Sequence, residues 1–177
     1  ALPLLAPTFS AMRIDADDKD PNAYVVLVGQ SGLGMPNRDY YLRDDKEITA
    51  NQEAYKKYLA QMLGFAGVKD AEPRAAAVYA VEHDIAVAHW PAADRRDADK
   101  TYNPMGLSQL SKFAPGFPWS AWFASAGIPP RSPKGDRRVV VAENTAFPAL
   151  AKVFAATPVP VWRDYLTIRY LHAMSSY

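Results

Sequence analysis

One segment near the N-terminal end carries more fold information than any other, and it reads Gln30-Ser31-Gly32-Leu33-Gly34-Met35-Pro36-Asn37-Arg38-Asp39-Tyr40-Tyr41-Leu42. Gly29 directly precedes it. Closely spaced glycines and a proline cannot continue a regular helix or strand, so we expect an ordered loop here.

The residues upstream of this loop predict a β-hairpin. Thr8 to Ala16 alternates loosely between apolar and polar residues, and Ala23 to Val28 is a β-branched run. A polar turn segment, Asp17 to Asn22, lies between them. This order is typical of two strands joined by a turn, and we expect a hairpin with a long loop.

The residues downstream of the loop predict two long helices. From about Asp44, apolar residues recur on one face at the helical period, and Gly64 or Gly67 favours the helix end. That face comprises Ile48, Tyr55, Tyr58, Leu59 and Met62. A second helix is expected from Glu72 to Trp90, ended by Pro91. Its buried stripe comprises Val78, Val81, Ile85 and Ala88.

Shorter elements are expected in the second half of the chain. They are helices over Leu107–Phe113, Trp119–Ala126, Asn144 or Thr145 to about Ala156, and from Val161 onward, and an extended piece near 138–142. Alanine is abundant beyond residue 50, and it favours helix. The predicted fold class is therefore mainly α, with a small β-hairpin near the N-terminus.

Composition narrows the class of protein. The chain has 177 residues, a formal net charge of +1 and no cysteine. The near-neutral charge argues against a dedicated nucleic-acid binder. The lack of cysteine excludes disulfides, thiolate nucleophiles and Cys-based zinc sites. No apolar stretch is long enough to span a membrane, so we expect no span in this segment.

No catalytic, cofactor-binding or metal-binding residue is predicted. His83, His89 and His172 lack the H-E-x-x-H spacing that brings two imidazoles to one zinc ion, and His83 and His89 are interpreted as surface or rim histidines on an amphipathic helix. The glycines of the loop match neither the dinucleotide fingerprint nor the P-loop. The start at Ala1 and a last periodic run that reaches the end of the chain without a stop signal suggest a fragment of a longer protein.

Several segments resemble the neprilysin and endothelin-converting-enzyme family of zinc metallopeptidases. Gly32 to Tyr41 is similar to the family's G-L-G-L-P-x-R-D-Y-Y segment, and Arg96 to Leu110 is similar to its R-D-x-x-x-x-Y-N-x-M-(T/S)-L-x-x-L stretch. Val81 to Ala86 resembles a helix written L-E-x-x-I-A, and Trp162 to Arg169 resembles W-x-x-Y-L-x-W-R. Order and spacing hold across essentially the whole chain.

The resemblance implies that residues 1–177 are part of a non-catalytic, helical N-terminal domain, with the zinc-bearing catalytic domain absent. The parent would be a zinc metalloendopeptidase, this segment itself inactive and without cofactor. The helical domain would cap the active-site cavity and restrict substrate size. The implied partners are the downstream catalytic domain and peptide substrates, and the implied location is extracytoplasmic.

A set of family-signature residues is interpreted as holding the fold, with a role in lining the cavity as the alternative. The set comprises Gly32, Gly34, Pro36, Arg38, Asp39, Tyr40, Tyr41, Arg96, Asp97, Tyr102 and Asn103. For the whole chain, the alternative function is a stand-alone helical module that binds peptides or other partners without enzymatic activity.

Overall fold

The computed structural model describes residues 9–133 and 135–174. Its contacts divide into two compact units. Unit 1 contains Phe9, Gly32–His89 and the C-terminal segment from Ala156, and unit 2 contains Ser10–Ser31 and Trp90–Ala155. Each unit is therefore assembled from segments that are distant in sequence.

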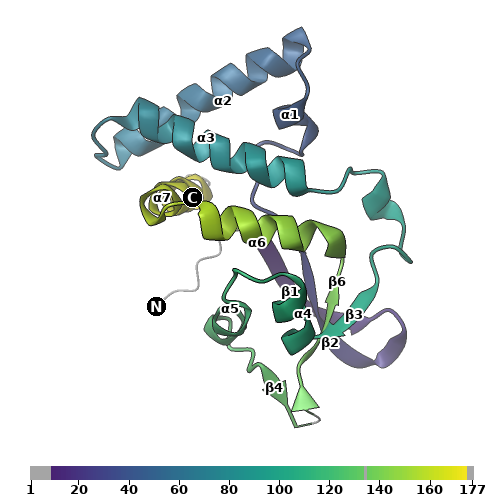
Figure 1. The fold of residues 1–177 in the computed structure, drawn as a ribbon. Helices are drawn as coiled ribbons and strands as arrows, with labels where there is room; N and C mark the ends of the chain where they lie inside the picture. The colour runs from purple at the N-terminus through teal and green to yellow at the C-terminus, as the bar shows by residue number, and fades with distance from the viewer. Residues whose placement is uncertain (1–8, 134, 175–177) are drawn as a thin grey trace. The chain divides into compact units, whose positions relative to one another are not determined.

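Unit 1 is helical. Its helices are α1 (Asp39–Leu42), α2 (Lys46–Phe65), α3 (Ala71–Ala88) and α7 (Val159–Met174), and Figure 1 shows α2 and α3 running side by side. The side chain of Asp45 caps α2 by accepting a hydrogen bond from the Ile48 N–H at 3.2 Å. The core comprises Leu59, Met62 and Leu63 of α2, Ala75 and Val78 of α3, and Tyr165 and Ile168 of α7.

Unit 2 is built on a mixed sheet with the strand order β1-β2-β6-β3. The strands are β1 (Ser10–Asp17), β2 (Asp20–Gln30), β6 (Arg138–Val141) and β3 (Asn103–Gly106). β2 and β6 are parallel, and the other two pairings are antiparallel. A minimal hairpin of β4 (Arg131–Ser132) and β5 (Gly135–Asp136) stands apart from this sheet.

Short helices complete unit 2. They are α4 (Leu107–Phe113), α5 (Trp119–Ser125) and α6 (Phe147–Ala156), with 3₁₀ turns at Asp94–Arg96 and Asn144–Ala146. Trp119 of α5 is buried against Phe147 of α6, with ring centroids 5.7 Å apart, and its indole N–H donates to the Ala114 carbonyl at 2.8 Å. All three residues of Val139–Val141 are also buried.

The mainly α fold class predicted from sequence is confirmed, but one detail of the β structure was wrong. The hairpin has no long loop, because Asp17 pairs with Asp20 and only two residues remain in the turn. Carboxylates stabilise this tight turn, since Asp17 accepts from the Lys19 N–H at 3.0 Å and Asp20 from the Asn22 N–H at 3.2 Å. The extended piece predicted near 138–142 is confirmed as strand β6, which lies between β2 and β3 in the sheet.

The predicted helices are present, with shifts at their ends. The helix expected from Asn144 begins at Phe147 after a 3₁₀ turn, and the last helix begins at Val159 rather than Val161. α3 ends at Ala88, because His89 adopts an extended conformation. Shifts of this size are usual where a helix end tightens into a 3₁₀ turn.

Candidate functional site

The glycine-rich loop of unit 1 is held by the phenol of Tyr41. The Tyr41 oxygen accepts hydrogen bonds from the Gly34 and Met35 N–H groups, both at 3.0 Å, and donates to Glu82 Oε2 at 2.6 Å. α1 turns Tyr41 back onto the loop, where it is 3% exposed. The hydroxyl thereby gives two backbone donors a partner in a place that is closed to water.

Glu82 of α3 is the centre of this network. It is completely buried, and its Oε2 also accepts from the Tyr55 hydroxyl at 2.8 Å and from Gly34 N–H at 3.4 Å. Burial raises the pKa of the Glu82 carboxyl, against the opposing effect of the Tyr41 hydrogen bond and the positive charge of Arg169. Glu82 Oε1 is buried without a hydrogen-bond partner.

Two side chains of α7 hold the other side of the loop. The Tyr165 hydroxyl donates to the Gly32 carbonyl at 2.8 Å, and Arg169 Nη2 donates to the Leu33 carbonyl at 2.7 Å. Tyr165 and Arg169 lie one helical turn apart, so both reach the loop from the same face of α7. Four buried or nearly buried side chains from three helices, Tyr41, Glu82, Tyr165 and Arg169, therefore fix the loop backbone.

The two glycines of the loop are required by close contacts. A Cβ added at Gly34 would lie 1.8 Å from the Tyr55 hydroxyl oxygen. Gly32 has φ +107°, and a Cβ there would lie 2.7 Å from the Cα of Phe9. The loop thus fits its helices only with glycine at both positions.

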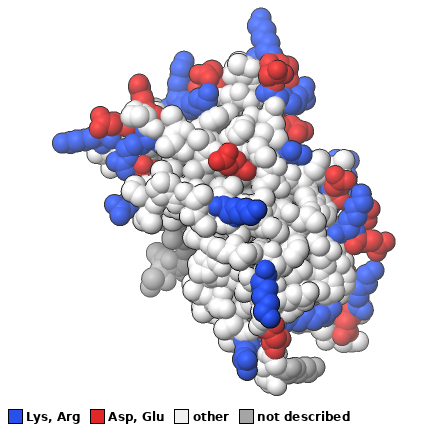
Figure 2. Space-filling view, in the orientation of Figure 1, with Lys and Arg blue, Asp and Glu red and all other residues white. Residues whose placement is uncertain are grey.

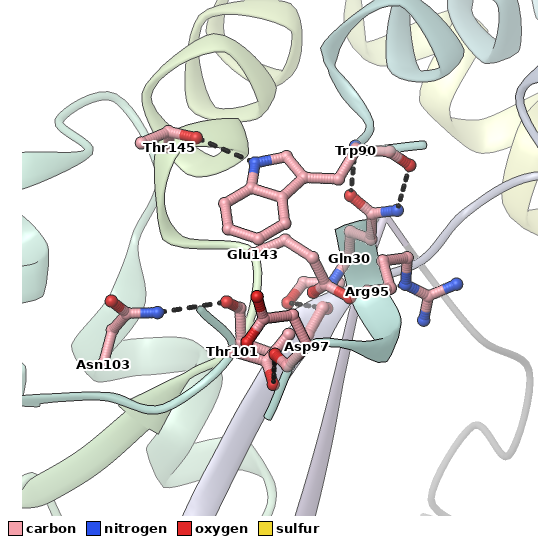
Figure 3. A network of polar contacts seen from close by, with 11 residues as sticks. Gln30, Trp90, Arg95, Asp97, Thr101, Asn103, Glu143 and Thr145 are labelled. Carbon is pink, nitrogen blue, oxygen red and sulfur yellow. Dashed lines mark hydrogen bonds and ion pairs between the residues drawn. The ribbon is translucent and has the colours of Figure 1, made fainter. Parts of the chain in front are cut away.

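Unit 2 has a second buried polar network, shown in Figure 3. Glu143, 2% exposed, accepts from the Gln30 N–H at 2.8 Å and from Arg95 Nε at 2.7 Å. The Gln30 side chain exchanges two hydrogen bonds with the Trp90 backbone, and the Trp90 indole N–H donates to Thr145 Oγ1 at 2.8 Å. This network fastens the connection after α3 to the end of β2.

A third network closes the far end of the hairpin. Asp17 is 1% exposed, and it accepts from the Tyr102 hydroxyl at 2.6 Å and from a guanidinium nitrogen of Arg138. Arg138 Nη2 also donates to the Tyr102 oxygen at 2.8 Å. The hydrogen bond from Tyr102, assisted by the Lys19 N–H, lowers the pKa of the Asp17 carboxyl.

The signature residues are divided between the two units. Gly32, Gly34, Pro36, Arg38, Asp39, Tyr40 and Tyr41 belong to unit 1, and Arg96, Asp97, Tyr102 and Asn103 belong to unit 2. Tyr41, Tyr102 and Asn103 make tertiary hydrogen bonds; the Asn103 amide donates to the Val141 carbonyl at 3.0 Å. Asp97 caps its own turn, while Pro36, Asp39 and Arg96 are exposed. Their role in lining a cavity stays a prediction.

Sequence reasoning missed the charged residues at the centres of these networks, Glu82, Glu143, Asp17, Arg138 and Arg169. A signal existed for Glu82: it lies four residues after Val78 and three before Ile85, within the apolar stripe of α3. A carboxylate in such a stripe is expected to be buried and to bind hydrogen-bond donors.

The interpretation of the histidines needs one correction. His83 is half-buried and His172 exposed, the latter hydrogen-bonded through Nδ1 to the Tyr58 hydroxyl at 2.7 Å, but His89 is buried at 7% exposed. It is neither a surface nor a rim residue, and it lies where α3 ends and the backbone becomes extended. Within residues 9–133 and 135–174, no three His, Asp or Glu side chains are grouped as metal ligands, so the residues described do not fit a zinc ion.

The charges and the shape of the described surface do not indicate a particular chemistry. On the face shown in Figure 2, basic and acidic side chains are interspersed over α2 and α3. A groove of about 490 Å³ between these two helices is lined by Ala60, Ala71 and Ala76 with Lys56, Lys57 and Glu53 at its sides. Among the described helices, none is both long and apolar enough to cross a lipid bilayer.

Comparison with known proteins identifies relatives of nearly the whole chain. The family model of peptidase family M13 matches residues 4–177. Human endothelin-converting enzyme-like 1 is 26% identical over 174 residues, which cover 97% of this chain and 22% of that protein. An endothelin-converting enzyme homolog of Locusta migratoria is 34% identical over 116 residues, 64% of this chain and 16% of that protein.

A solved structure agrees with this match. The zinc metalloprotease Zmp1 of Mycobacterium tuberculosis, in complex with an inhibitor, superposes with a TM-score of 0.85 at 30% identity, over 96% of this chain and 26% of Zmp1. The chain therefore spans about a quarter or less of the length of these relatives.

Proposed function

Because the chain belongs to peptidase family M13, we propose that residues 1–177 form part of the non-catalytic, helical N-terminal domain of a neprilysin-like zinc metalloendopeptidase. The match of the family model over residues 4–177 carries this proposal. Two facts support a non-catalytic role for the segment itself. The sequence contains no H-E-x-x-H motif, and the described residues offer no cluster of zinc ligands.

The proposed role of this domain is to cap the active-site cavity of the parent enzyme and to restrict its substrates to short peptides. A wall can exclude folded proteins only if it keeps its shape. The glycine-rich loop of unit 1 supports such rigidity, since Tyr41, Glu82, Tyr165 and Arg169 fix its backbone from three helices. The partners in this proposal are the catalytic domain of the same polypeptide and its peptide substrates, and the location is extracytoplasmic.

Zinc content and peptidase activity test this proposal. The purified chain should contain well under one zinc per chain by atomic emission and should not cleave a fluorogenic peptide. A longer polypeptide from the same gene, containing an H-E-x-x-H segment, should bind one zinc and lose activity with a chelator. One equivalent of zinc on the 177-residue chain, or chelator-sensitive cleavage by it, would falsify the proposal.

A stand-alone peptide-binding module is the second candidate, and the groove between α2 and α3 favours it. A groove of about 490 Å³ with an alanine floor could accept small side chains of a peptide. Titration of the chain with a library of short peptides separates the candidates. Saturable binding that Ala60→Trp abolishes supports the peptide-binding module. If no peptide binds, the result favours the proposal of a non-catalytic peptidase domain.

A further inference from the structure

The outer edge of β1 is open in unit 2. β1 is the first strand in the order β1-β2-β6-β3, so one of its edges pairs with β2 and, among the residues described, no strand pairs with the other. The strand extends over eight residues, Ser10–Asp17. From Ala11 to Ala16, this edge offers a row of backbone donors and acceptors to another strand.

The middle of β1 is exposed and partly apolar. Ile14 is 61% exposed, and its charged neighbours Arg13 and Asp15 have side chains 72% and 58% exposed. Across the hairpin, Tyr24 is 83% exposed and pairs with Ala16, so Ile14 and Tyr24 lie diagonally on the same face. Ile14 and Tyr24 form an apolar patch beside the open edge.

The charges around Ile14 favour one strand orientation when two copies of β1 pair. Edge strands are commonly protected from pairing by charged side chains. Here a positive and a negative side chain flank Ile14 symmetrically. If two copies of β1 pair antiparallel about Ile14, Arg13 of each copy lies opposite Asp15 of the other. Parallel pairing in register would place Arg13 opposite Arg13 and is disfavoured.

We propose that β1 pairs antiparallel with β1 of a second copy of this chain, with Ile14 on the two-fold axis. The contact uses the same surface on both copies, as two-fold symmetry requires. It joins the open backbone edges, covers the Ile14 side chains and replaces the Arg13–Asp15 ion pair within each strand, at 3.5 Å, with two ion pairs between the strands. The sheet then continues from one copy into the other.

A single cysteine tests the register directly, because the natural chain has none. In the proposed pairing the two Ile14 Cα atoms face each other at the separation of directly opposed strand residues, about 4.5–5.5 Å, which suits a disulfide. Ile14→Cys should therefore form a disulfide-linked dimer with oxidised glutathione. Asp15→Cys should cross-link far less, because it faces Arg13.

Val159→Cys is the matched control, since Val159 is 72% exposed and lies in unit 1. The proposal expects this variant to stay monomeric under the same oxidation. Equal cross-linking of the three variants, or a monomeric Ile14→Cys protein with native circular dichroism, overturns the pairing.

Charge exchange provides an independent test. Arg13→Asp places two pairs of acids opposite each other, and Asp15→Arg places two pairs of guanidinium groups opposite each other. Each change should weaken dimerisation about tenfold in sedimentation velocity at low salt, while the double exchange should restore it. A monomeric wild-type chain at every concentration, unaffected single variants, or a double exchange that fails to restore the dimer contradicts the proposal.

Discussion

Gly34 is a position where the loop of unit 1 has no room for a larger residue unless Tyr55 moves. A Cβ there would lie 1.8 Å from the Tyr55 hydroxyl oxygen and 2.7 Å from Cζ of that ring. Tyr55 is hydrogen-bonded to the buried Glu82, so it cannot move without losing that contact. We expect Gly34→Ala to reduce the free energy of unfolding by about 1–3 kcal/mol, measured by urea denaturation.

Gly64 is the matched control for this change. It lies within α2, and nothing lies within 4 Å of the position of its Cβ. Gly64→Ala should therefore raise stability by about 0.5–1 kcal/mol. If the two substitutions have the same effect, the steric argument at Gly34 is wrong.

Asp17 gives the chain an acid-sensitive contact. The hydrogen bond from Tyr102 lowers its pKa below the ordinary value of 3.8, so the folded state favours the ionised form. The resulting stability is present above the pKa of the unfolded state and is lost as pH falls through the lower folded pKa. The free energy of unfolding should therefore fall below about pH 4 in urea titrations.

Tyr102→Phe should reduce this loss of stability at acid pH, because it removes the hydrogen bond that contributes most to the lowered pKa of Asp17. Tyr170→Phe is the control, because Tyr170 is 50% exposed, and it should leave the loss of stability at acid pH unchanged. If both variants lose the same stability at acid pH, the loss comes from carboxylates other than Asp17.

Glu82 contributes a pH dependence of stability that is opposite in sign to that of Asp17. Burial raises its pKa above 4.5, so the stability that the neutral carboxyl provides is complete below the unfolded pKa and is lost as pH rises through the folded pKa. Glu82→Gln cannot ionise and keeps an acceptor for Tyr41 and Tyr55. We therefore expect the variant to gain stability relative to wild type as pH rises above about 4.5.

Exposed Glu47 supplies the comparison for this experiment. Glu47→Gln should keep the pH dependence of the wild type between acid and neutral pH. A constant difference between wild type and Glu82→Gln across that range would show that the Glu82 carboxyl has the same pKa in the folded and unfolded states, which contradicts the raised pKa.

At the scale of elements, the start of α2 depends on one side chain. Asp45 Oδ1 accepts from the Ile48 N–H, which has no partner within the helix. Asp45→Ala should cost about 1 kcal/mol of stability in thermal or urea unfolding. Asp44→Ala, at the exposed residue before the cap, should cost much less, and an equal loss would contradict the capping role.

Elements with a clear period could be predicted from sequence, and elements made by tertiary pairing could not. α2 follows from the spacing of Ile48, Leu59 and Met62, all buried as expected. β3 carries no comparable signal, because Asn103-Pro104-Met105-Gly106 contains proline and glycine. It is a strand because β6 offers it an edge, and that partner lies more than 30 residues away in sequence.

The buried polar networks also combine parts that the sequence predicts with parts that only the tertiary structure shows. The Gly32–Tyr41 segment could be recognised from its own residues, and Tyr41 does bind the loop backbone. Arg169 could not be assigned to that loop, because it lies 136 residues further along the chain than Leu33, whose carbonyl it binds. A local pattern shows that a residue is helical, but it does not show which distant backbone its side chain reaches.

At the scale of the whole molecule, the proposed wall predicts a limit on substrate size in the parent peptidase. The intact enzyme should cleave a short flexible peptide and should leave the same sequence uncut within a folded domain, measured as kcat/KM for both substrates. Because the limit depends on a rigid wall, Gly34→Ala in that enzyme should raise the longest peptide cleaved, whereas Gly64→Ala should not. Equal rates on the free peptide and the folded substrate, or one length limit for all three enzymes, would remove the reason to assign size selection to this domain.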